Sequence, residues 1–235
     1  MQDIGGVLSL AFGLVISGNN DLLEIVGLSL RVSLSALLTS SLIGLLIGAS
    51  VAIGRFRGRT ALKIMLNALM GLPPVVVGLM VYLMLSNAGP LGSLGLLYTP
   101  SAMIIAQAIL ITPIIAALSA EVIENIYSEY REYFASLAMG RWAIIRALVW
   151  DGRYGLLTVV LAGFGRAIAE VGAIMIVGGN IDHLTRVMTT AIALETSKGD
   201  LALALALGLI LITLSVIING AVMALNMSAR RYAYA

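Results

Sequence analysis

Long runs without a charged side chain divide this sequence. No charged residue occurs from Val32 to Gly54, from Ile64 to Ala120, or from Leu201 to about Met227. Because about 20 apolar residues cross the hydrocarbon core of a bilayer, the middle run is long enough for two crossings. Glycine and proline interrupt that run between Asn87 and Gly95, and Tyr98-Thr-Pro100 restarts it.

The pattern predicts five membrane-spanning helices. They lie near residues 22–54, 61–87, 99–121, 154–178 and 201–228, and the fourth is interrupted only by Arg166 and Glu170. A spanning segment must satisfy its backbone internally, so an all-α transmembrane bundle is expected. Met1 to Gly18 is apolar but short, which favours an N-terminal interfacial helix over a sixth span. It has no basic n-region, so a cleaved signal peptide is not expected.

Basic residues set the orientation of the bundle. With five spans, ten lysines and arginines fall on one side, which is expected to be the cytoplasm. The opposite loops hold only Arg186 and Lys198, so the N-terminus is predicted outside and the C-terminus inside. Residues 1–235 are interpreted as one transmembrane domain. The ten cytoplasmic residues are Arg55, Arg57, Arg59, Lys63, Arg131, Arg141, Arg146, Arg153, Arg230 and Arg231.

Composition narrows the functional classes. The chain is 60% hydrophobic and 11% charged, with a mean hydropathy of +1.04, which fits a lipid-facing protein. A net charge of +2 gives no reason to expect nucleic-acid binding. There is no cysteine, and His183 is the only histidine, so no metal site is expected. No Gly-x-x-x-x-Gly-Lys-Ser/Thr loop occurs, so the chain is not expected to hydrolyse ATP itself.

The most polar segment runs from Glu121 to Arg153 and holds nine of the chain's 26 charged residues. Apolar positions recur at helical spacing up to Gly140, and a second short segment begins at Arg141. The pattern predicts a helix, a glycine turn and a helix that dock a soluble partner. A solvated connector is the alternative. Aromatic residues favour docking, since they are enriched at interfaces; they are Tyr127, Tyr130, Tyr133, Phe134 and Trp142.

This segment resembles the cytoplasmic loop of ATP-binding-cassette (ABC) importer permeases, in which Glu-Ala-Ala is followed after three residues by Gly. Ala135 and Gly140 fit that spacing, whereas Phe134 stands where the glutamate is expected and Glu132 lies two residues earlier. The Leu-Pro end of the pattern is replaced by Trp150-Asp-Gly-Arg153. The resemblance implies a loop that couples ATP hydrolysis to transport, with Glu132, Phe134, Ala135, Ser136, Gly140 and Arg141 as its candidate residues.

A second resemblance covers roughly Leu22 to Ile218. The segments at 163–173, 176–180, 185–190 and 194–200 look like the molybdate/tungstate permease group, and those at 71–78 and 89–92 look like its tungstate branch. The resemblance implies a type I ABC importer permease fold in a prokaryotic cytoplasmic membrane. It also implies an oxyanion substrate, tungstate first and molybdate next, with sulfate as an alternative within the family.

The same resemblance implies the partners. A second copy of the chain would complete the pore, two cytoplasmic ATP-binding-cassette subunits would hold ATP and Mg²⁺, and an extracytoplasmic protein would deliver the oxyanion. No cofactor is expected in this chain.

Three sets of residues are candidates for the pore or the dimer interface. Arg166 and Glu170, four apart on the expected fourth span, either face a wet cavity or form a neutralised structural pair. Pro73 and Pro74 either open a substrate path or only kink the second span. Neutral donors in the outer segment between spans four and five either line the path or belong to a surface loop; these are Asn180, Thr189 and Thr190.

Two other classes of function remain open at this stage. An ion-coupled carrier or channel would use an intramembrane carboxylate, for which Glu170 is the only candidate. An intramembrane enzyme would need a metal or nucleophile cluster, and one histidine without cysteine argues against it.

Overall fold

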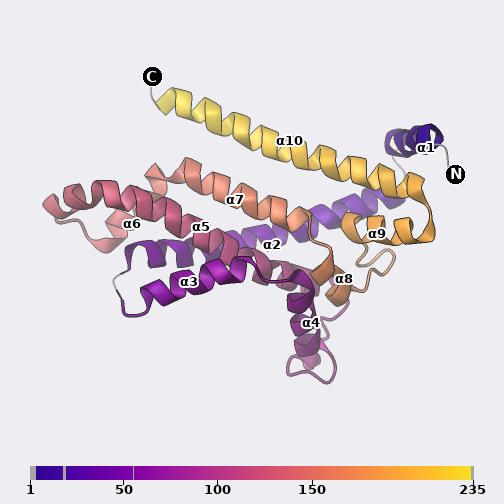
Figure 1. Ribbon diagram of the computed structural model, residues 1–235, viewed down its shortest axis with the longest axis horizontal. Coiled ribbons are helices and arrows are strands. Elements are labelled where there is room, and N and C mark those ends of the chain that lie inside the picture. Colours follow the sequence, from indigo (N-terminus) through magenta and orange to yellow (C-terminus); the bar gives the residue numbers. More distant parts are fainter. Residues whose placement is uncertain (1–3, 18–19, 55, 234–235) are drawn as a thin grey trace. The chain divides into compact units, whose positions relative to one another are not determined.

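A computed structural model describes residues 4–17, 20–54 and 56–233, and every long element in these ranges is an α-helix (Figure 1). The expected all-α fold is confirmed. The helices are α1 (Ile4–Ser17), α2 (Asn20–Ile53), α3 (Arg59–Met70), α4 (Pro74–Leu85), α5 (Pro100–Ser136), α6 (Arg141–Asp151), α7 (Arg153–Ile168), α8 (Gly172–Gly178), α9 (Met188–Lys198) and α10 (Leu201–Ala233), with a 3₁₀ turn, η1, at Gly92–Leu94.

Three of the five expected spans are single helices. α2, α5 and the stretch Leu201–Ala224 of α10 are each long and apolar enough to cross a membrane. The other two are interrupted pairs, α3 with α4 and α7 with α8, each with a break of at most four residues. Counting each pair as one span gives the five that the charge-free runs predict. The break after α3 lies at Pro73 and Pro74, where the sequence predicts that the second span is disturbed. The sequence does not predict the break after α7.

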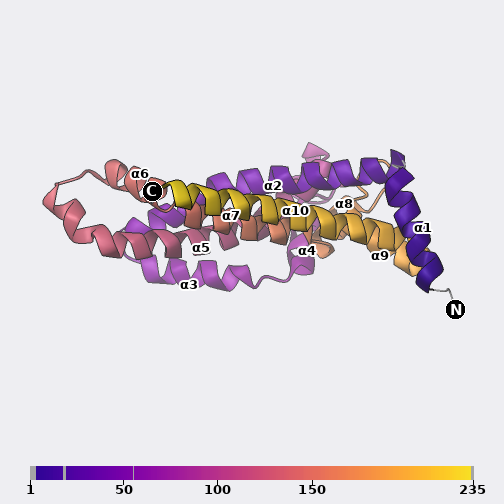
Figure 2. The same ribbon diagram turned by 90° about the horizontal axis from the view of Figure 1, so that it is seen from above.

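The N-terminal segment forms the expected helix. α1 is 14 residues long and packs against α10 in its own part of the molecule, near the beginning of α10 (Figure 2). Residues 1–3 and 18–19, at the ends of the expected interfacial helix, and Arg55, one of the ten basic residues, lie outside the described residues. The position of α1 at a membrane interface remains a prediction.

The chain forms two compact units, each assembled from separate stretches of sequence. Unit 1 comprises Met1–Ser35, Pro74–Gln107 and Ala167–Ala235, and unit 2 comprises Ala36–Pro73 and Ala108–Arg166. In unit 1, α9 packs on α10 through a core of Leu22, Met188, Ala191 and Leu207. The core of unit 2 joins the end of α2 to α5, α6 and α7 through Ala49, Ala52, Ile123, Phe134, Leu148 and Leu156.

Within unit 1, α4 and α8 pack closely because one of them carries a glycine at the contact. A Cβ atom added at Gly78 would lie 2.7 Å from Cα of Ala173, which is backbone and cannot rotate away. Small residues at helix contacts allow such close approach, a device typical of membrane helices. The second halves of both interrupted spans are therefore joined to each other.

We expect Gly78→Ala to destabilise the protein although the change favours a helix intrinsically. Replacing glycine by alanine in a helix usually gains about 0.5–1 kcal/mol, but overpacking costs about 1–3 kcal/mol. Thermal unfolding in detergent should therefore show a lower midpoint for Gly78→Ala. Gly208→Ala in α10, where the new Cβ meets no described atom within 4 Å, is the matched control and should be neutral or stabilising. An unchanged midpoint for Gly78→Ala would contradict the close packing.

Candidate functional site

The interruption of the fourth span lies between α7 and α8, at residues 169–171. Glu170 is therefore outside both helices, and its side chain is 3% exposed. The expectation that Arg166 and Glu170 share one face of a continuous helix is wrong, because the helix ends at Ile168. Their mutual neutralisation remains a prediction.

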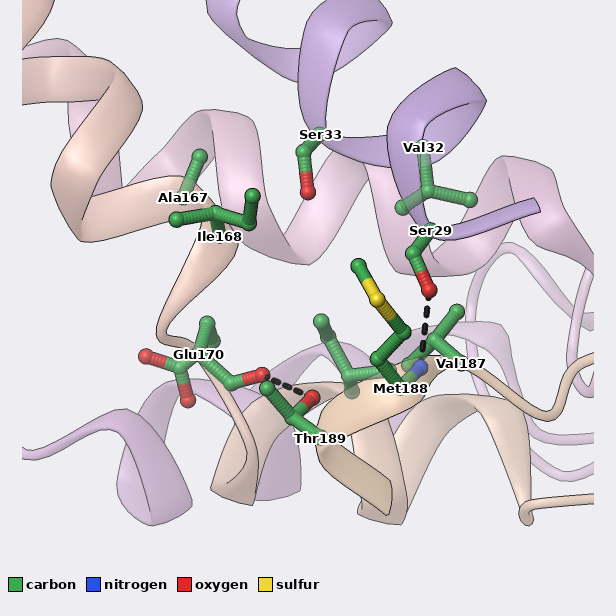
Figure 3. Close-up of a pocket in the computed structure, with 10 residues that line it drawn as sticks. Ser29, Val32, Ser33, Ala167, Ile168, Glu170, Val187, Met188 and Thr189 are labelled. Atoms are coloured by element: carbon green, nitrogen blue, oxygen red, sulfur yellow. Dashed lines mark hydrogen bonds between the residues drawn. The ribbon is translucent and has the colours of Figure 1, made fainter. Parts of the chain in front are cut away.

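Hydrogen bonds from three elements satisfy the backbone at this break. The carbonyl of Ala167 accepts the Glu170 amide at 3.3 Å and Nε2 of the buried Gln107, from α5, at 2.9 Å. The carbonyl of Glu170 accepts Oγ1 of Thr189, from α9, at 2.8 Å (Figure 3). The Glu170 carboxylate in turn accepts the amide of Ala173, in α8, at 3.1 Å. We call these four hydrogen bonds the brace, and they supply partners that an unbroken helix would have supplied.

The start of α9 is fixed in a similar way. The Met188 amide donates to Oγ of Ser29 on α2 at 2.7 Å (Figure 3), and the Ser29 hydroxyl donates to the carbonyl of Ile25 at 2.6 Å. The Thr190 hydroxyl accepts the Val187 amide at 3.1 Å. The segment that provides Thr189 to the brace is thus itself held by side chains that are buried.

A small cavity lies beside the brace. Its polar lining consists of Ser29, Ser33, Glu170 and Thr189, all at most 9% exposed, and the Ser33 hydroxyl points into the space between α2 and the break (Figure 3). The cavity volume is about 10 Å³, close to the minimum that admits one water molecule. A tetrahedral oxyanion does not fit there, and a carboxylate in the wall would repel it.

The neutral donors expected to line the path are used within the fold. Thr189 and Thr190 are buried, and their hydroxyls are bonded to the backbone at Glu170 and Val187. Asn180, in the left-handed conformation with φ 50°, donates Nδ2 to the carbonyl of Thr190 at 3.4 Å. In this structure each of the three donates to a backbone carbonyl of the loop or the brace, and a role as donors to a passing anion stays a prediction.

Sequence reasoning missed the residues that support these donors. Gln107 and Ser29 both act through hydrogen bonds to backbone, and so does Thr185, whose hydroxyl donates to the carbonyl of Gly178 at 2.6 Å. These residues could have been found because single polar residues within apolar runs of a span normally face other parts of the protein and not lipid.

The prolines of the second span produce a break and not a kink. α3 ends at Met70, and Pro74 is the first residue of α4, where its missing N–H costs nothing. In contrast, α5 continues as one helix through Pro113. Beyond Pro74, one side of α4 is exposed and wholly apolar, with Val75, Val76, Leu79, Met80, Leu83 and Met84.

On the predicted outer side, the loop between α8 and α9 is tied to the beginning of α2. Nδ1 of His183 lies 2.9 Å from Oε2 of Glu24, and Arg186 pairs with Asp182 at 2.7 Å. The hydrogen bond to Glu24 and the negative charges of Glu24 and Asp182 raise the pKa of His183 above its usual range. His183, the single histidine of the sequence, therefore forms a contact with another element.

The polar segment from Glu121 to Arg153 has the predicted helix, turn and helix. α5 ends at Ser136 and α6 begins at Arg141. The first helix is not a separate element, however, because α5 continues without a break from the apolar span into the loop. Gly140 has φ −69° and ψ 154°, an extended conformation open to any residue, and no described atom lies within 4 Å of the position of a Cβ there.

Burial separates the candidate coupling residues into two groups. Phe134 is 7% exposed, packs in the core of unit 2 and stacks with Tyr127, so its expected role as an exposed anchor is wrong. Trp142 and Trp150 on α6 are 82% and 70% exposed. Trp150 had not been singled out as an anchor. The remaining candidates are all exposed, namely Glu132, Ala135, Ser136, Gly140 and Arg141.

The exposed side of α6 borders a hollow with a volume of about 1160 Å³. Its lining is mainly apolar and includes Trp142, Trp150 and two cations, Arg146 and Arg153. The Arg153 guanidinium lies over the Trp150 ring, 4.7 Å from its centroid, in a cation–π contact. Large aromatic surfaces with basic rims are typical of protein interfaces.

Comparisons with known proteins identify the family of this chain. The model of the family described as "binding-protein-dependent transport system inner membrane component" matches residues 40–231. The chain belongs to this family. The permease is 41% identical to the probable anion ABC transporter permease protein of Haloferax volcanii, over 84% of this chain and 88% of that protein.

Two further relatives have more specific names. The tungstate uptake system permease protein TupB of Peptoclostridium acidaminophilum is 39% identical to the permease, over 96% of this chain and 99% of that protein. The protein of the same name from Campylobacter jejuni is 40% identical, over 70% of this chain and 69% of that protein.

We expect Thr189→Val to weaken the brace. The change keeps the shape of the side chain but leaves the buried carbonyl of Glu170 without its donor, which costs about 1–3 kcal/mol. Thermal unfolding in detergent should show a clearly lower midpoint. Thr158→Val removes a similar hydroxyl-to-backbone bond at an exposed position of α7 and should change stability by less than about 0.5 kcal/mol. Equal effects of the two variants would mean that the Thr189 bond has no special importance.

Proposed function

We propose that this permease is the membrane-spanning subunit of an ATP-driven importer for tungstate, with molybdate as the second anion. The assignment of tungstate as the substrate rests on the match along 96% of the chain to a protein named as a tungstate uptake permease. The segments at 71–78 and 89–92, which resemble the tungstate branch, add to this support; the first spans the break before α4, and the second ends at the first residue of η1.

The partner that hydrolyses ATP is proposed to dock on α6. Trp142 and Trp150 are the large exposed aromatic groups there, and Arg146 and Arg153 add positive charge to the rim of the same hollow. An acidic or amphipathic surface on the ATPase would fit this lining. ATP and Mg²⁺ are assigned to that subunit, and an extracytoplasmic binding protein is proposed to deliver the anion to the other side.

A second copy of the permease is proposed to complete the pore. The cavity beside the brace is too small for an oxyanion, and its carboxylate disfavours one. The path is therefore built with surfaces outside the brace, and the exposed apolar side of α4 is suited to face another copy. Glu170 is assigned to holding the break, which removes the carboxylate that an ion-coupled carrier would use.

The experiment reconstitutes the permease with its ATPase and binding protein in vesicles. We expect ATP-dependent uptake of tungstate that excess molybdate inhibits and excess sulfate does not. Gly140→Val should reduce copurification of the ATPase at least tenfold while the permease stays folded, because only a partner can clash at that open position. Gly208→Val, at another open glycine, should leave copurification unchanged. Uptake that continues without ATP would contradict an ABC importer and favour a carrier.

The orientation is proposed with the N-terminus outside and the C-terminus inside. The chain has no cysteine, so single cysteines can be labelled without background. In intact cells an impermeant thiol reagent should label Ser93→Cys, in η1, and should not label Ser128→Cys, in α5; both positions are exposed. Ser93 is a better site than Gly92, where a Cβ would lie 2.3 Å from the carbonyl of Ser86. The reverse labelling pattern would refute this orientation.

A further inference from the structure

Within unit 2, three charged residues meet at the predicted cytoplasmic end of the helices. Glu124 on α5 accepts Nη2 of Arg59 at 2.9 Å and also accepts Nζ of Lys63. Both cations are on α3, four residues apart, so they lie on one face of that helix. We call Arg59, Lys63 and Glu124 the clamp.

Arg59 also joins a third helix. Its Nε donates to the carbonyl of Val51 and its Nη2 to the carbonyl of Ala52, each at 2.7 Å. These carbonyls are in the last turn of α2, where a helix leaves carbonyl groups without partners and favours a cation. One guanidinium therefore connects the end of α2, the beginning of α3 and the side of α5.

The two positive charges on α3 are unfavourable without the negative charge of Glu124. Two like charges four residues apart repel each other, and cations in the first turns of a helix oppose its dipole. Glu124 compensates both effects. The hydrogen bond from Lys63, together with the positive charges of Lys63 and Arg59, holds the pKa of the Glu124 carboxyl below its usual range. The Glu124 carboxylate is therefore ionised at neutral pH.

The clamp is only partly buried, and this matters for its role. The exposed fractions of the side chains of Arg59, Lys63 and Glu124 are 32%, 29% and 37%. A cavity of about 180 Å³ lies beside it, lined by Lys63, Asn67, Glu121 and Glu124 among others. Ion pairs with this exposure contribute little to stability, but they can break and re-form in water without a large desolvation cost.

The clamp joins the predicted coupling segment, residues 121–153, to α3. Glu124 lies near the beginning of that segment, and α5 runs without interruption from it to Ser136, before the turn at Gly140. α3 leads in the other direction through the break at Pro73 into α4. The apolar contact of Leu66 on α3 with Ala116 and Ala120 on α5 packs the same two helices that the clamp links through polar groups.

We propose that the clamp is a positioning device that transmits movement of the coupling loop to α3, so that ATP hydrolysis on the partner changes the conformation of the second span. Glu124 is its centre, and Arg59 and Lys63 are the two attachments on α3. This inference rests on the proposed function, since it requires an ATPase at α6.

The test measures tungstate uptake per ATP hydrolysed in the reconstituted transporter, normalised to the amount of assembled complex. Glu124→Gln removes both ion pairs and leaves two uncompensated cations. It should lower uptake per ATP at least fivefold, with ATPase copurification within twofold of the unmodified protein. Lys63→Met keeps the Arg59–Glu124 pair and should give a smaller loss, about twofold.

Glu121→Gln is the matched control. It removes the same charge from the same helix, at an exposed position that lines the same cavity and forms no ion pair within the described part of the chain. Uptake per ATP should stay within 1.5-fold, roughly the scatter expected for a surface change without a partner.

The outcomes separate this inference from the proposed function. If the unmodified permease binds no ATPase or moves no tungstate, the proposed function fails. If it does both and Glu124→Gln keeps full uptake per ATP, the clamp does not transmit movement and the inference is overturned. If Glu124→Gln fails to assemble, Lys63→Met decides, and unchanged uptake per ATP in that variant reduces the clamp to a scaffold.

Discussion

A backbone amide or carbonyl in hydrocarbon must have a hydrogen-bond partner, and the permease depends on this constraint twice. A continuous helix meets the requirement by itself. An interrupted helix does not, so other elements must supply the missing donors and acceptors. At the break between α7 and α8, the supply comes from Gln107 on α5, Thr189 on α9 and the carboxylate of Glu170 itself. The break is therefore stabilised by specific hydrogen bonds, and α9 is held where Thr189 can donate one of them.

This constraint explains which parts of the fold the sequence could predict. Charge-free runs report how much chain lies in lipid, so the positions of α2, α5 and α10 follow from hydropathy alone. The break before α4 follows from Pro73 and Pro74, because proline cannot donate to a helix. The break after α7 has no proline. It forms because distant hydroxyl and amide groups satisfy its backbone, and a local pattern carries no record of contacts with residues 19 or 60 positions away.

The same distinction between local patterns and contacts with distant residues applies to the candidate site. The helix, turn and helix of the coupling loop are local and were predicted. The burial of Phe134 depends on Ala49 and Ala52, far away in sequence, so its aromatic character indicated an exposed anchor that the fold does not provide. Trp142 and Trp150 have the same chemical character and are exposed. Thr189 and Thr190 likewise have hydroxyls that could bind an anion, but in the structure these hydroxyls donate to backbone carbonyls.

The length of α5 has a consequence for the environment of the ATPase partner. Its 37 residues correspond to about 55 Å of helix, whereas the hydrocarbon core is about 30 Å thick. Roughly 25 Å of the same rigid rod therefore extends past the hydrocarbon, beyond most of the headgroup layer. An ATPase docked on α6, as proposed, would lie at a distance from the lipid that the length of α5 sets. Bilayers of different thickness or headgroup charge would then disturb such a docking contact little, because a helix that begins inside the bundle carries it.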